Sequence, residues 1–266
     1  MDMSDALLAA ARTAIGQCLG VGSEESVVVV TDDEREPIGE ALYDAAAAVT
    51  DDVTLLRYPP SDQHGTEPPA PVAAAMAESD VFVAPTTKSL SHTRARGAAC
   101  AADARGATLP GITQSVFETG LDADYDAIDA ACDSVLEAVG DASTVRVTAP
   151  AGTDLTVEVG DREWLADRGV VHAPGAFSNL PAGEVFLAPE TASGTVVVDG
   201  TMMPHGRLES GQSVSIEVAD GLVTAIDDDA VRADVEAAAT SVGDDAYTFA
   251  ELGIGTNVGV DRLVGS

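Results

Sequence analysis

Two short segments in the second half of the chain combine a glutamate with turn-forming and apolar residues. In NLPAGEVFLAPE, Glu184 stands between a Pro-Ala-Gly turn and an apolar run, and Glu251 opens the glycine-rich string ELGIGTN. A carboxylate beside an apolar strand is costly to bury unless a cation compensates it, and glycines let the backbone approach a ligand closely. Both glutamates are therefore candidate metal ligands. Taken alone, each segment is more typical of a structural position than of a metal site: an exposed strand start for Glu184 and a structural turn for Glu251.

The chain also has four histidines, the other common source of metal ligands: His64, His92, His172 and His205. The sequence around each is more typical of a structural or exposed histidine than of a ligand. His172, in VVHAPG, has the best claim to lie near Glu184, because only a short turn separates the two. No Ser-His-Asp order or Cys-His pair stands out, so the sequence assigns no catalytic or substrate-binding residue.

The first half of the chain alternates strands with helices. Short β-branched or apolar runs, of which SVVVVT is the clearest, predict buried strands over residues 26–31, 53–58, 81–85 and 106–112. Alanine-rich stretches with helical periodicity predict helices over residues 3–19, 34–49, 72–78, 92–104 and 122–139. This alternation implies an α/β domain with a parallel sheet and right-handed crossovers.

After about residue 140 the pattern changes to strands. TVRVT and DLTVEV alternate with period two on either side of APAGT, which predicts neighbouring antiparallel strands over 144–148 and 154–159. Further strands are expected over 183–188, 195–199, 214–218, 222–227 and 250–255, with a helix over 231–239. We therefore expect two domains: an α/β domain over residues 1–142, and a β-rich α+β domain over residues 143–266 that carries both glutamates.

The charge of the chain is strongly negative, with 45 acidic residues against 13 basic ones and a formal net charge of −32. Lys88 is the only lysine. Such a surface repels itself at low ionic strength, and salt screens that repulsion, so the composition predicts a halophilic protein. No segment is basic enough to bind nucleic acid or an anionic membrane surface.

The remaining composition points to a globular, cytoplasmic protein. The chain does not open with a basic region followed by an apolar run, and it has no stretch of about 18 apolar residues, which argues against a signal peptide and a membrane helix. Three cysteines at no short spacing, Cys18, Cys100 and Cys132, indicate buried free thiols rather than a disulfide framework or a zinc motif.

The strings NLPAGEVFLAPE and ELGIGTN resemble the thermophilic-type metallo-aminopeptidases, the leucyl aminopeptidase or aminopeptidase T family. Their glutamates are 67 residues apart (251 − 184). Segments 87–113 and 147–159 resemble the same family, so the resemblance spans roughly the whole chain. It implies that Glu184 and Glu251 bind one or two divalent ions, zinc, cobalt or manganese, in a homodimer that hydrolyses N-terminal residues from peptides through a metal-activated water. Ala182 departs mildly from the family's usual NLPGGEV.

The resemblance is incomplete at its end. The family has further ligands beyond ELGIGTN, namely a histidine and then a close histidine-aspartate pair, but this sequence stops at Ser266. We therefore expect a C-terminally truncated piece of a longer product, or a chain that has lost catalysis. Two other functions stay open: an iron-dependent ring-cleaving dioxygenase, whose scaffold resembles these aminopeptidases, and a non-catalytic binding or assembly protein.

Overall fold

The computed structural model describes residues 4–260 and 263. They form two compact units, each of which draws on separate parts of the chain. Unit 1 contains residues 4–131, 167–183 and 256–260, and unit 2 contains residues 132–166, 184–255 and 263. The sequence pattern predicts one domain boundary, at 142/143. In the structure the chain leaves unit 1 inside a helix, after Ala131, and returns to it twice, so each unit is described by itself.

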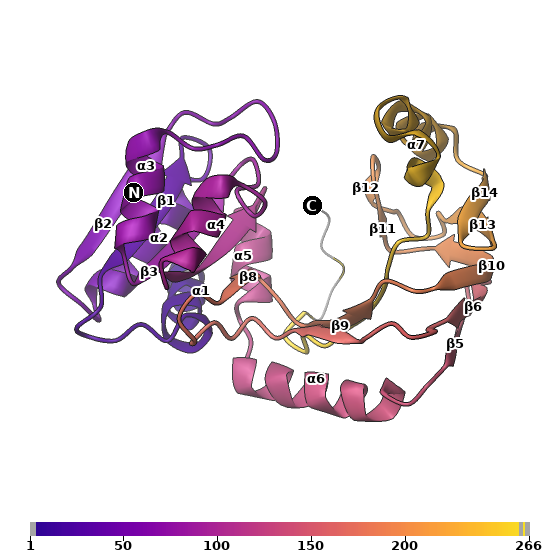
Figure 1. The fold of residues 1–266 in the computed structure, drawn as a ribbon, viewed down its shortest axis with the longest axis horizontal. Coiled ribbons are helices and arrows are strands. Elements are labelled where there is room, and N and C mark those ends of the chain that lie inside the picture. The colour runs from indigo at the N-terminus through magenta and orange to yellow at the C-terminus, as the bar shows by residue number, and fades with distance from the viewer. Residues whose placement is uncertain (1–3, 261–262, 264–266) are drawn as a thin grey trace. The chain divides into compact units, whose positions relative to one another are not determined.

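A five-stranded sheet, in the order β2-β1-β3-β4-β8, forms the centre of unit 1 (Figure 1). All of its strand pairs are parallel. Its strands are β1 (Val27–Asp32), β2 (Val53–Tyr58), β3 (Val81–Thr86), β4 (Arg105–Pro110) and β8 (Phe177–Asn179). Every residue of β1 and β3 is buried, as the continuous apolar runs predict for strands covered on both faces. The α/β class expected for this part of the chain is confirmed.

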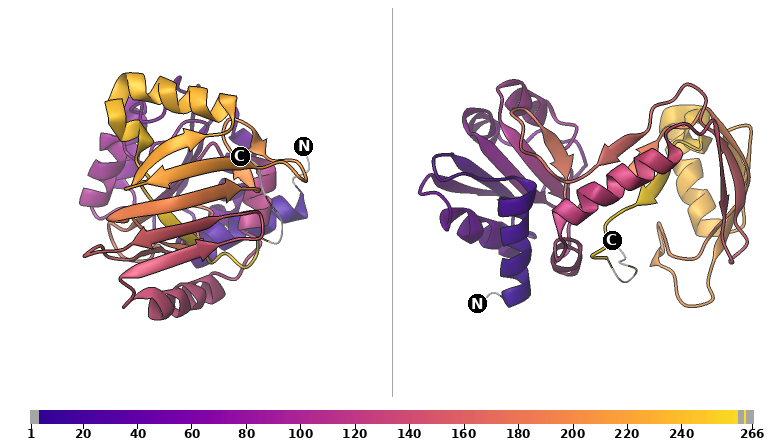
Figure 2. Two further views of the ribbon diagram at one scale, coloured as in Figure 1. Left: turned by 90° about the vertical axis from the view of Figure 1, so that its right-hand side faces the viewer. Right: turned by 90° about the horizontal axis from the view of Figure 1, so that it is seen from below.

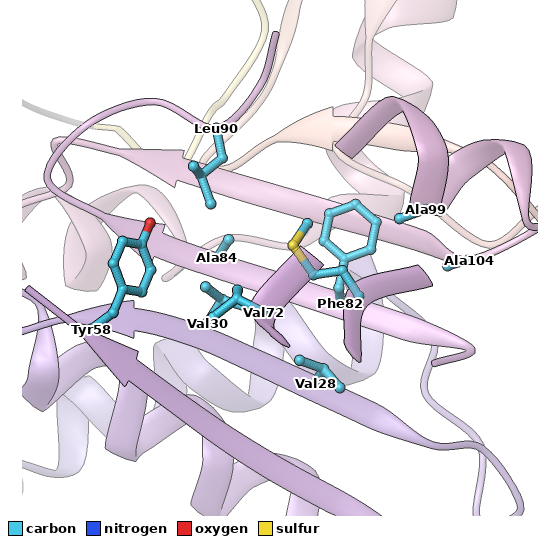
Figure 3. Packing of buried hydrophobic residues seen from close by; sticks show 10 residues of the cluster. Val28, Val30, Tyr58, Val72, Phe82, Ala84, Leu90, Ala99 and Ala104 are labelled. Carbon is cyan, nitrogen blue, oxygen red and sulfur yellow. The ribbon is translucent and has the colours of Figure 1, made fainter. Parts of the chain in front are cut away.

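The helices of unit 1 connect these strands. They are α1 (Asp5–Thr13), extended by a π-helical turn over Ala14–Cys18, α2 (Glu36–Ala47), α3 (Ala70–Glu78), α4 (Arg94–Ala101) and α5 (Gln114–Gly120). One core cluster brings residues of three neighbouring strands together with α3 and α4 (Figure 3): Val28, Val30, Tyr58, Val72, Met76, Phe82, Ala84, Leu90, Ala99 and Ala104. The small alanine side chains of α4 allow the helix to pack closely against the sheet. Cys18 and Cys132 are fully buried and Cys100 half-buried, all as free thiols.

Arg105, at the start of β4, is the buried cation of unit 1. Its guanidinium donates to both carboxylate oxygens of Glu25, at 2.7 and 2.6 Å, and to the backbone oxygens of Leu19 and Gly20, at 2.9 and 3.1 Å. The hydrogen bond from Arg105 holds the pKa of Glu25 below its usual range. This bidentate pair satisfies the donors that burial would otherwise leave unpaired, and it joins the segment after α1 to the sheet.

Helix α6 (Tyr125–Val139) runs from unit 1 into unit 2. Unit 2 is built on an antiparallel sheet in the order β14-β13-β10-β6-β5, which the left view of Figure 2 faces. Its strands are β5 (Thr144–Thr148), β6 (Asp154–Glu158), β10 (Thr191–Val198), β13 (Val214–Ala219) and β14 (Leu222–Ile226). The antiparallel pairing of β5 with β6 confirms the neighbouring antiparallel strands expected there.

Smaller elements complete unit 2. A second sheet has the order β15-β9-β7, and its strands are β7 (Leu165–Asp167), β9 (Glu184–Leu187) and β15 (Leu252–Gly255). Strands β11 (Thr201–Met202) and β12 (Gly206–Arg207) form a short ribbon, and helix α7 (Asp229–Val242) leads into a 3₁₀ turn, Gly243–Tyr247. Among the described helices, none is long and apolar enough to cross a membrane.

Candidate metal site

The structure brings the two glutamate segments together as one antiparallel ladder. Glu184 is the first residue of β9, and Glu251 directly precedes β15. The two strands pair with Gly255 opposite Glu184, Gly253 opposite Phe186 and Leu252 opposite Leu187. Segments 67 residues apart in the sequence (251 − 184) are therefore hydrogen-bonded neighbours in unit 2.

This ladder has a packed face and an open face. Side chains alternate along a strand, and directly opposite residues share a face. Val185 and Leu187 are buried, and Leu252 packs against the core of the large sheet in unit 2. By the same alternation Glu184, Glu251 and the two glycines of β15 lie together on the other face. Gly253, Gly255 and Glu251 are exposed there, and Glu184 is half-buried.

Gly253 and Gly255 give β15 a floor without side chains on the open face, and half-buried Phe186 of β9 lies on the same face, opposite Gly253. A Cβ atom added at Gly253 would lie 3.0 Å from Oε2 of Glu184. The carboxylate of Glu184 therefore reaches across to β15, over Gly253 rather than its direct partner Gly255. Glu251 precedes Gly253 by two residues on the same face, a step of about 7 Å along a strand. The side chain of Glu184 thus leans toward the end of the ladder that Glu251 occupies.

These two carboxylates fit the acidic part of a divalent-metal site. Carboxylate oxygens bind zinc, manganese and iron, and the glycine floor lets an ion approach the backbone. Catalytic sites of this kind use at least three protein ligands. Within residues 4–260 and 263, no three His, Cys, Asp or Glu side chains gather in a way that could hold a metal ion. The described residues would therefore supply two ligands of such a site and not a complete set.

The histidines have other contacts. Nε2 of His172 lies 2.8 Å from the backbone oxygen of Gln17, and Nε2 of His205 lies 2.9 Å from Oδ1 of Asp228. Nδ1 of His64 accepts a hydrogen bond from the backbone of Ser89, at 3.2 Å. His92 is exposed. Each has a structural contact or an exposed position, as the sequence analysis favoured, and the partner found for His172 is Gln17 rather than Glu184.

A cavity of about 990 Å³ in unit 2 lies elsewhere. It is lined by Ala151, Asp199, Leu263 and the loop from Arg207 to Ser213, and neither glutamate belongs to its lining. The candidate metal site is therefore an open strand face. Its definition rests on the register of β9 and β15 rather than on an enclosed pocket.

Asn257 and the turn before Glu184 are features that the sequence analysis quoted without giving them a role. The backbone N–H of Thr256 donates to the oxygen of Gly183 at 2.8 Å, which continues the ladder by one pair beyond Gly255 and Glu184. Nδ2 of Asn257 donates to the backbone oxygen of Ala182 at 2.9 Å. The positive φ of Gly183, 128°, lets the turn pass close to Asn257. The sequence marks these residues only as members of the strings NLPAGEVFLAPE and ELGIGTN. Their contacts could not be predicted, because the partners are distant in sequence.

The glycine floor gives a test of the site that does not alter a ligand. We expect Gly253→Ala to weaken binding of Mn²⁺ or Co²⁺ about tenfold, because the new methyl group displaces the Glu184 carboxylate. Stability is expected to change by less than about 1 kcal/mol, since the neighbour that must move is the flexible end of an exposed-face side chain. Isothermal titration and thermal unfolding measure the two effects.

Gly255→Ala is the matched control. It adds the same methyl group to the same strand and face, where nothing lies within 4 Å. Metal affinity should stay within about twofold of the wild-type value, which is below the effect of a displaced ligand. Equal losses in both variants would mean that the Glu184 carboxylate is not the group that Gly253 accommodates.

A family model and two solved structures match nearly the whole chain. The model of the NicX family, 2,5-dihydroxypyridine 5,6-dioxygenase, matches residues 6–261. Among solved structures, the 2,5-dihydroxypyridine dioxygenase from Pseudomonas putida KT2440 aligns with a TM-score of 0.73 at 18% identity, over 95% of this chain and 77% of that one. Wild-type AmpT from Thermus thermophilus aligns with a TM-score of 0.61 at 16% identity, over 94% of this chain and 78% of that one. A search of curated proteins finds no match.

Proposed function

The chain belongs to the family of 2,5-dihydroxypyridine 5,6-dioxygenases, and from that premise we propose that it is a metal-dependent dioxygenase acting on a hydroxylated, electron-rich aromatic ring. The observation that carries the proposal is the family match, which covers residues 6–261. The likeness to the Pseudomonas putida dioxygenase supports a shared fold. The sequence favoured peptide hydrolysis over ring cleavage by a dioxygenase. The family match reverses that order.

In this proposal the open face of the ladder is the metal-binding part of the active site. Glu184 and Glu251 would hold the ion through carboxylate oxygens, and Gly253 and Gly255 would keep the space above the strand clear for a substrate. A bound redox-active metal such as iron would supply the chemistry by which dioxygen reacts with the ring. The packed face, through Val185 and Leu187, keeps the two carboxylates in register.

The proposed reaction is balanced without a further reductant. A ring-cleaving dioxygenase places both atoms of one O₂ in its product, breaks one carbon–carbon bond of the ring, and draws the electrons for reducing oxygen from the dihydroxylated ring itself. For a 2,5-dihydroxypyridine cleaved at positions 5 and 6, the bond that breaks joins the hydroxyl-bearing C5 to C6. A substrate of this class needs an electron-donating hydroxyl next to the cleaved bond.

Peptide hydrolysis is the second candidate, and one specific observation favours it. The two strings that resemble metallo-aminopeptidases, around Glu184 and Glu251, are the two strands of one ladder. AmpT, an aminopeptidase, has the same overall fold. In this alternative the same carboxylates would hold one or two zinc, cobalt or manganese ions, and the substrate would be the N-terminus of a peptide.

Parallel assays distinguish the candidates. The purified protein, in about 2 M KCl to screen its charge, is loaded separately with Fe²⁺, Mn²⁺, Co²⁺ and Zn²⁺. Oxygen uptake with 2,5-dihydroxypyridine is followed with an oxygen electrode, and release of nitroaniline from aminoacyl nitroanilides is followed by absorbance. The proposal predicts oxygen uptake with Fe²⁺, at one O₂ per ring opened, and no nitroaniline release.

The other outcomes are equally informative. Nitroaniline release with Zn²⁺, Co²⁺ or Mn²⁺ and no oxygen uptake would replace the dioxygenase by the aminopeptidase. Neither activity with any ion, despite metal binding, in this chain and in the product of the whole reading frame would support a non-catalytic binding protein on this scaffold. The same assays on the product of the whole reading frame then test whether residues beyond this chain complete the metal site.

A further inference from the structure

We propose that Asn257, together with Tyr125, positions the two metal-binding strands by locking the turn that enters β9 to the turn that leaves β15. This inference rests on the proposed function, because it assigns these residues to the metal site of that function. All residues of the lock belong to unit 1, whereas the ladder belongs to unit 2, so the lock acts through the peptide bonds Gly183–Glu184 and Gly255–Thr256. Asn257 is thus a positioning residue that acts through Glu184 and Glu251.

The side chain of Asn257 is fully committed to backbone partners. Its Nδ2 donates to the oxygen of Gly120 at 3.0 Å and to the oxygen of Ala182 at 2.9 Å. Its Oδ1 accepts from the N–H of Gly259 at 3.1 Å. Two carbonyl partners on one side and one N–H on the other fix the orientation of the amide. The side chain therefore joins the end of α5, the turn before Glu184 and the segment after β15.

Tyr125 supports the same turn from inside unit 1. It is fully buried, and its hydroxyl accepts a hydrogen bond from the backbone N–H of Ala182 at 3.3 Å. The hydroxyl oxygen also lies 3.5 Å from the backbone oxygen of Gly120, to which Asn257 donates. Burial raises the pKa of Tyr125, so the hydroxyl keeps its proton at neutral pH. Gly120 and Ala182 are thus each contacted by both side chains.

Close packing leaves little room for these turns to move. A Cβ atom at Gly183 would lie 2.8 to 3.0 Å from the Cβ, N and Cα atoms of Asn257. A Cβ atom at Gly120 would lie 2.5 Å from the ring of Pro181. Displacing any one of these segments therefore displaces the others.

The contacts of Asn257 and Tyr125 hold the residues directly next to the two metal-binding strands. Gly183 is covalently followed by Glu184, and Thr256, which donates to Gly183 at 2.8 Å, directly follows the last residue of β15. Metal ligands must be held within about 0.5 Å of their working positions. A shift of one turn against the other changes the register of β9 and β15, and with it the separation of the two carboxylates. Loss of the Asn257 hydrogen-bond donors is therefore expected to change the separation of the Glu184 and Glu251 carboxylates.

Asn257→Asp tests the inference with little change in shape. The substitution replaces the amide donor by a carboxylate oxygen, which faces the oxygens of Gly120 and Ala182 without a proton to share. We expect the affinity for Co²⁺ to fall about 10- to 100-fold, as for other residues that orient metal ligands. The visible absorption of bound Co²⁺ should also change, because it reports ligand geometry. Tyr125→Phe, which loses only the hydroxyl, should show a smaller loss in the same direction.

A matched control separates positioning from general stability. Thr50→Val removes two hydrogen bonds of a buried hydroxyl in unit 1, one to the oxygen of Glu25 at 2.9 Å and one from the N–H of Asp52 at 3.2 Å. It should lower the melting temperature, yet leave Co²⁺ affinity and absorption within about twofold of wild type, short of the change expected for a residue that orients ligands. Metal titrations are made well below the melting temperature of every variant.

Each outcome bears on one claim. A wild-type protein that binds no Co²⁺ would overturn the metal site of the proposed function, whatever Asn257 does. A wild-type protein that binds Co²⁺, with Asn257→Asp binding it equally well and with the same spectrum, would overturn the positioning role alone. Equal losses in Asn257→Asp and Thr50→Val would also overturn it, because a remote destabilisation would then have the same effect.

Discussion

Replacing Glu184 with glutamine is expected to lower metal affinity and turnover by more than about 100-fold. This loss is larger than the loss expected when a residue that only orients a metal ligand is replaced. Glutamine keeps the shape of the side chain but replaces an anionic oxygen by an amide nitrogen, which does not bind a cation. Titration with Fe²⁺ and Mn²⁺ measures the affinity, and the oxygen electrode measures turnover. Glu251→Gln is expected to give the same result, because both side chains lie on the open face of one ladder.

The effect of metal on folding gives a second measurement of the same site. With metal, the wild-type protein gains stability from binding and the variant does not. Thermal unfolding with and without the ion therefore shows a metal-dependent shift in the wild type that is absent in Glu184→Gln.

Glu236→Gln provides the comparison for charge alone. Glu236 is an exposed residue of α7 in the same unit, so its substitution removes one negative charge away from the ladder. Its metal affinity and turnover should match the wild type. If Glu184→Gln and Glu251→Gln also bind metal and turn over like the wild type, the site lies elsewhere in the chain and the ladder is structural.

The parts of the fold that the sequence predicted are those with a local signal. β1 and β3 are buried on every residue, and their apolar runs, VVVV in β1 and VFVAP in β3, indicate buried strands directly. β8, of only three residues, joins the edge of the same sheet beside β4, about 70 residues earlier in the chain. No local pattern distinguishes such a short strand from a turn. The single domain boundary expected at 142/143 differs from the structure for a related reason, since α6 continues through the first crossing between the units.

In the candidate site, too, the local features could be predicted from the sequence and the tertiary contacts could not. Residue type and neighbouring glycines made Glu184 and Glu251 candidates, because a carboxylate beside a turn and an apolar run is costly to bury without a partner. The prediction that they bind metal came from the resemblance of their two strings to the metallo-aminopeptidases. Their relation to each other is a matter of register, which places Gly255 opposite Glu184 and is fixed only by tertiary pairing. The role of Asn257 depends on Gly120, 137 residues away, so the sequence carries its identity but not its partner.

The largest effect on stability is expected from salt. Raising KCl from about 0.1 M to 1 M shortens the Debye length from about 10 Å to about 3 Å. With 45 acidic and 13 basic residues, repulsion within the folded chain exceeds that within the expanded unfolded chain. Treating both states as uniformly charged spheres in water, Coulomb's law with this screening gives a gain in folding free energy on the order of 10 kcal/mol. That corresponds to a rise in melting temperature of about 20 °C for a chain of this size.

Local ion pairs act in the opposite direction but are too weak to reverse this trend. Exposed pairs such as Arg146 with Asp154, whose closest atoms are 2.8 Å apart, contribute little to stability and are weakened by salt. The contribution of repulsion can be isolated on α2, where Glu40 and Asp44 are exposed one turn apart.

We expect the double substitution Glu40→Gln with Asp44→Asn to stabilise the protein in 0.1 M KCl, by on the order of 1 kcal/mol, and to have little effect in 1 M KCl, where screening has already removed the repulsion. Thermal unfolding at both salt concentrations measures this difference. General salting-out would stabilise wild type and variant by equal amounts, because it acts on buried area rather than on charge. Equal gains in the two proteins would therefore show that screening of acidic repulsion is not the source of the salt dependence.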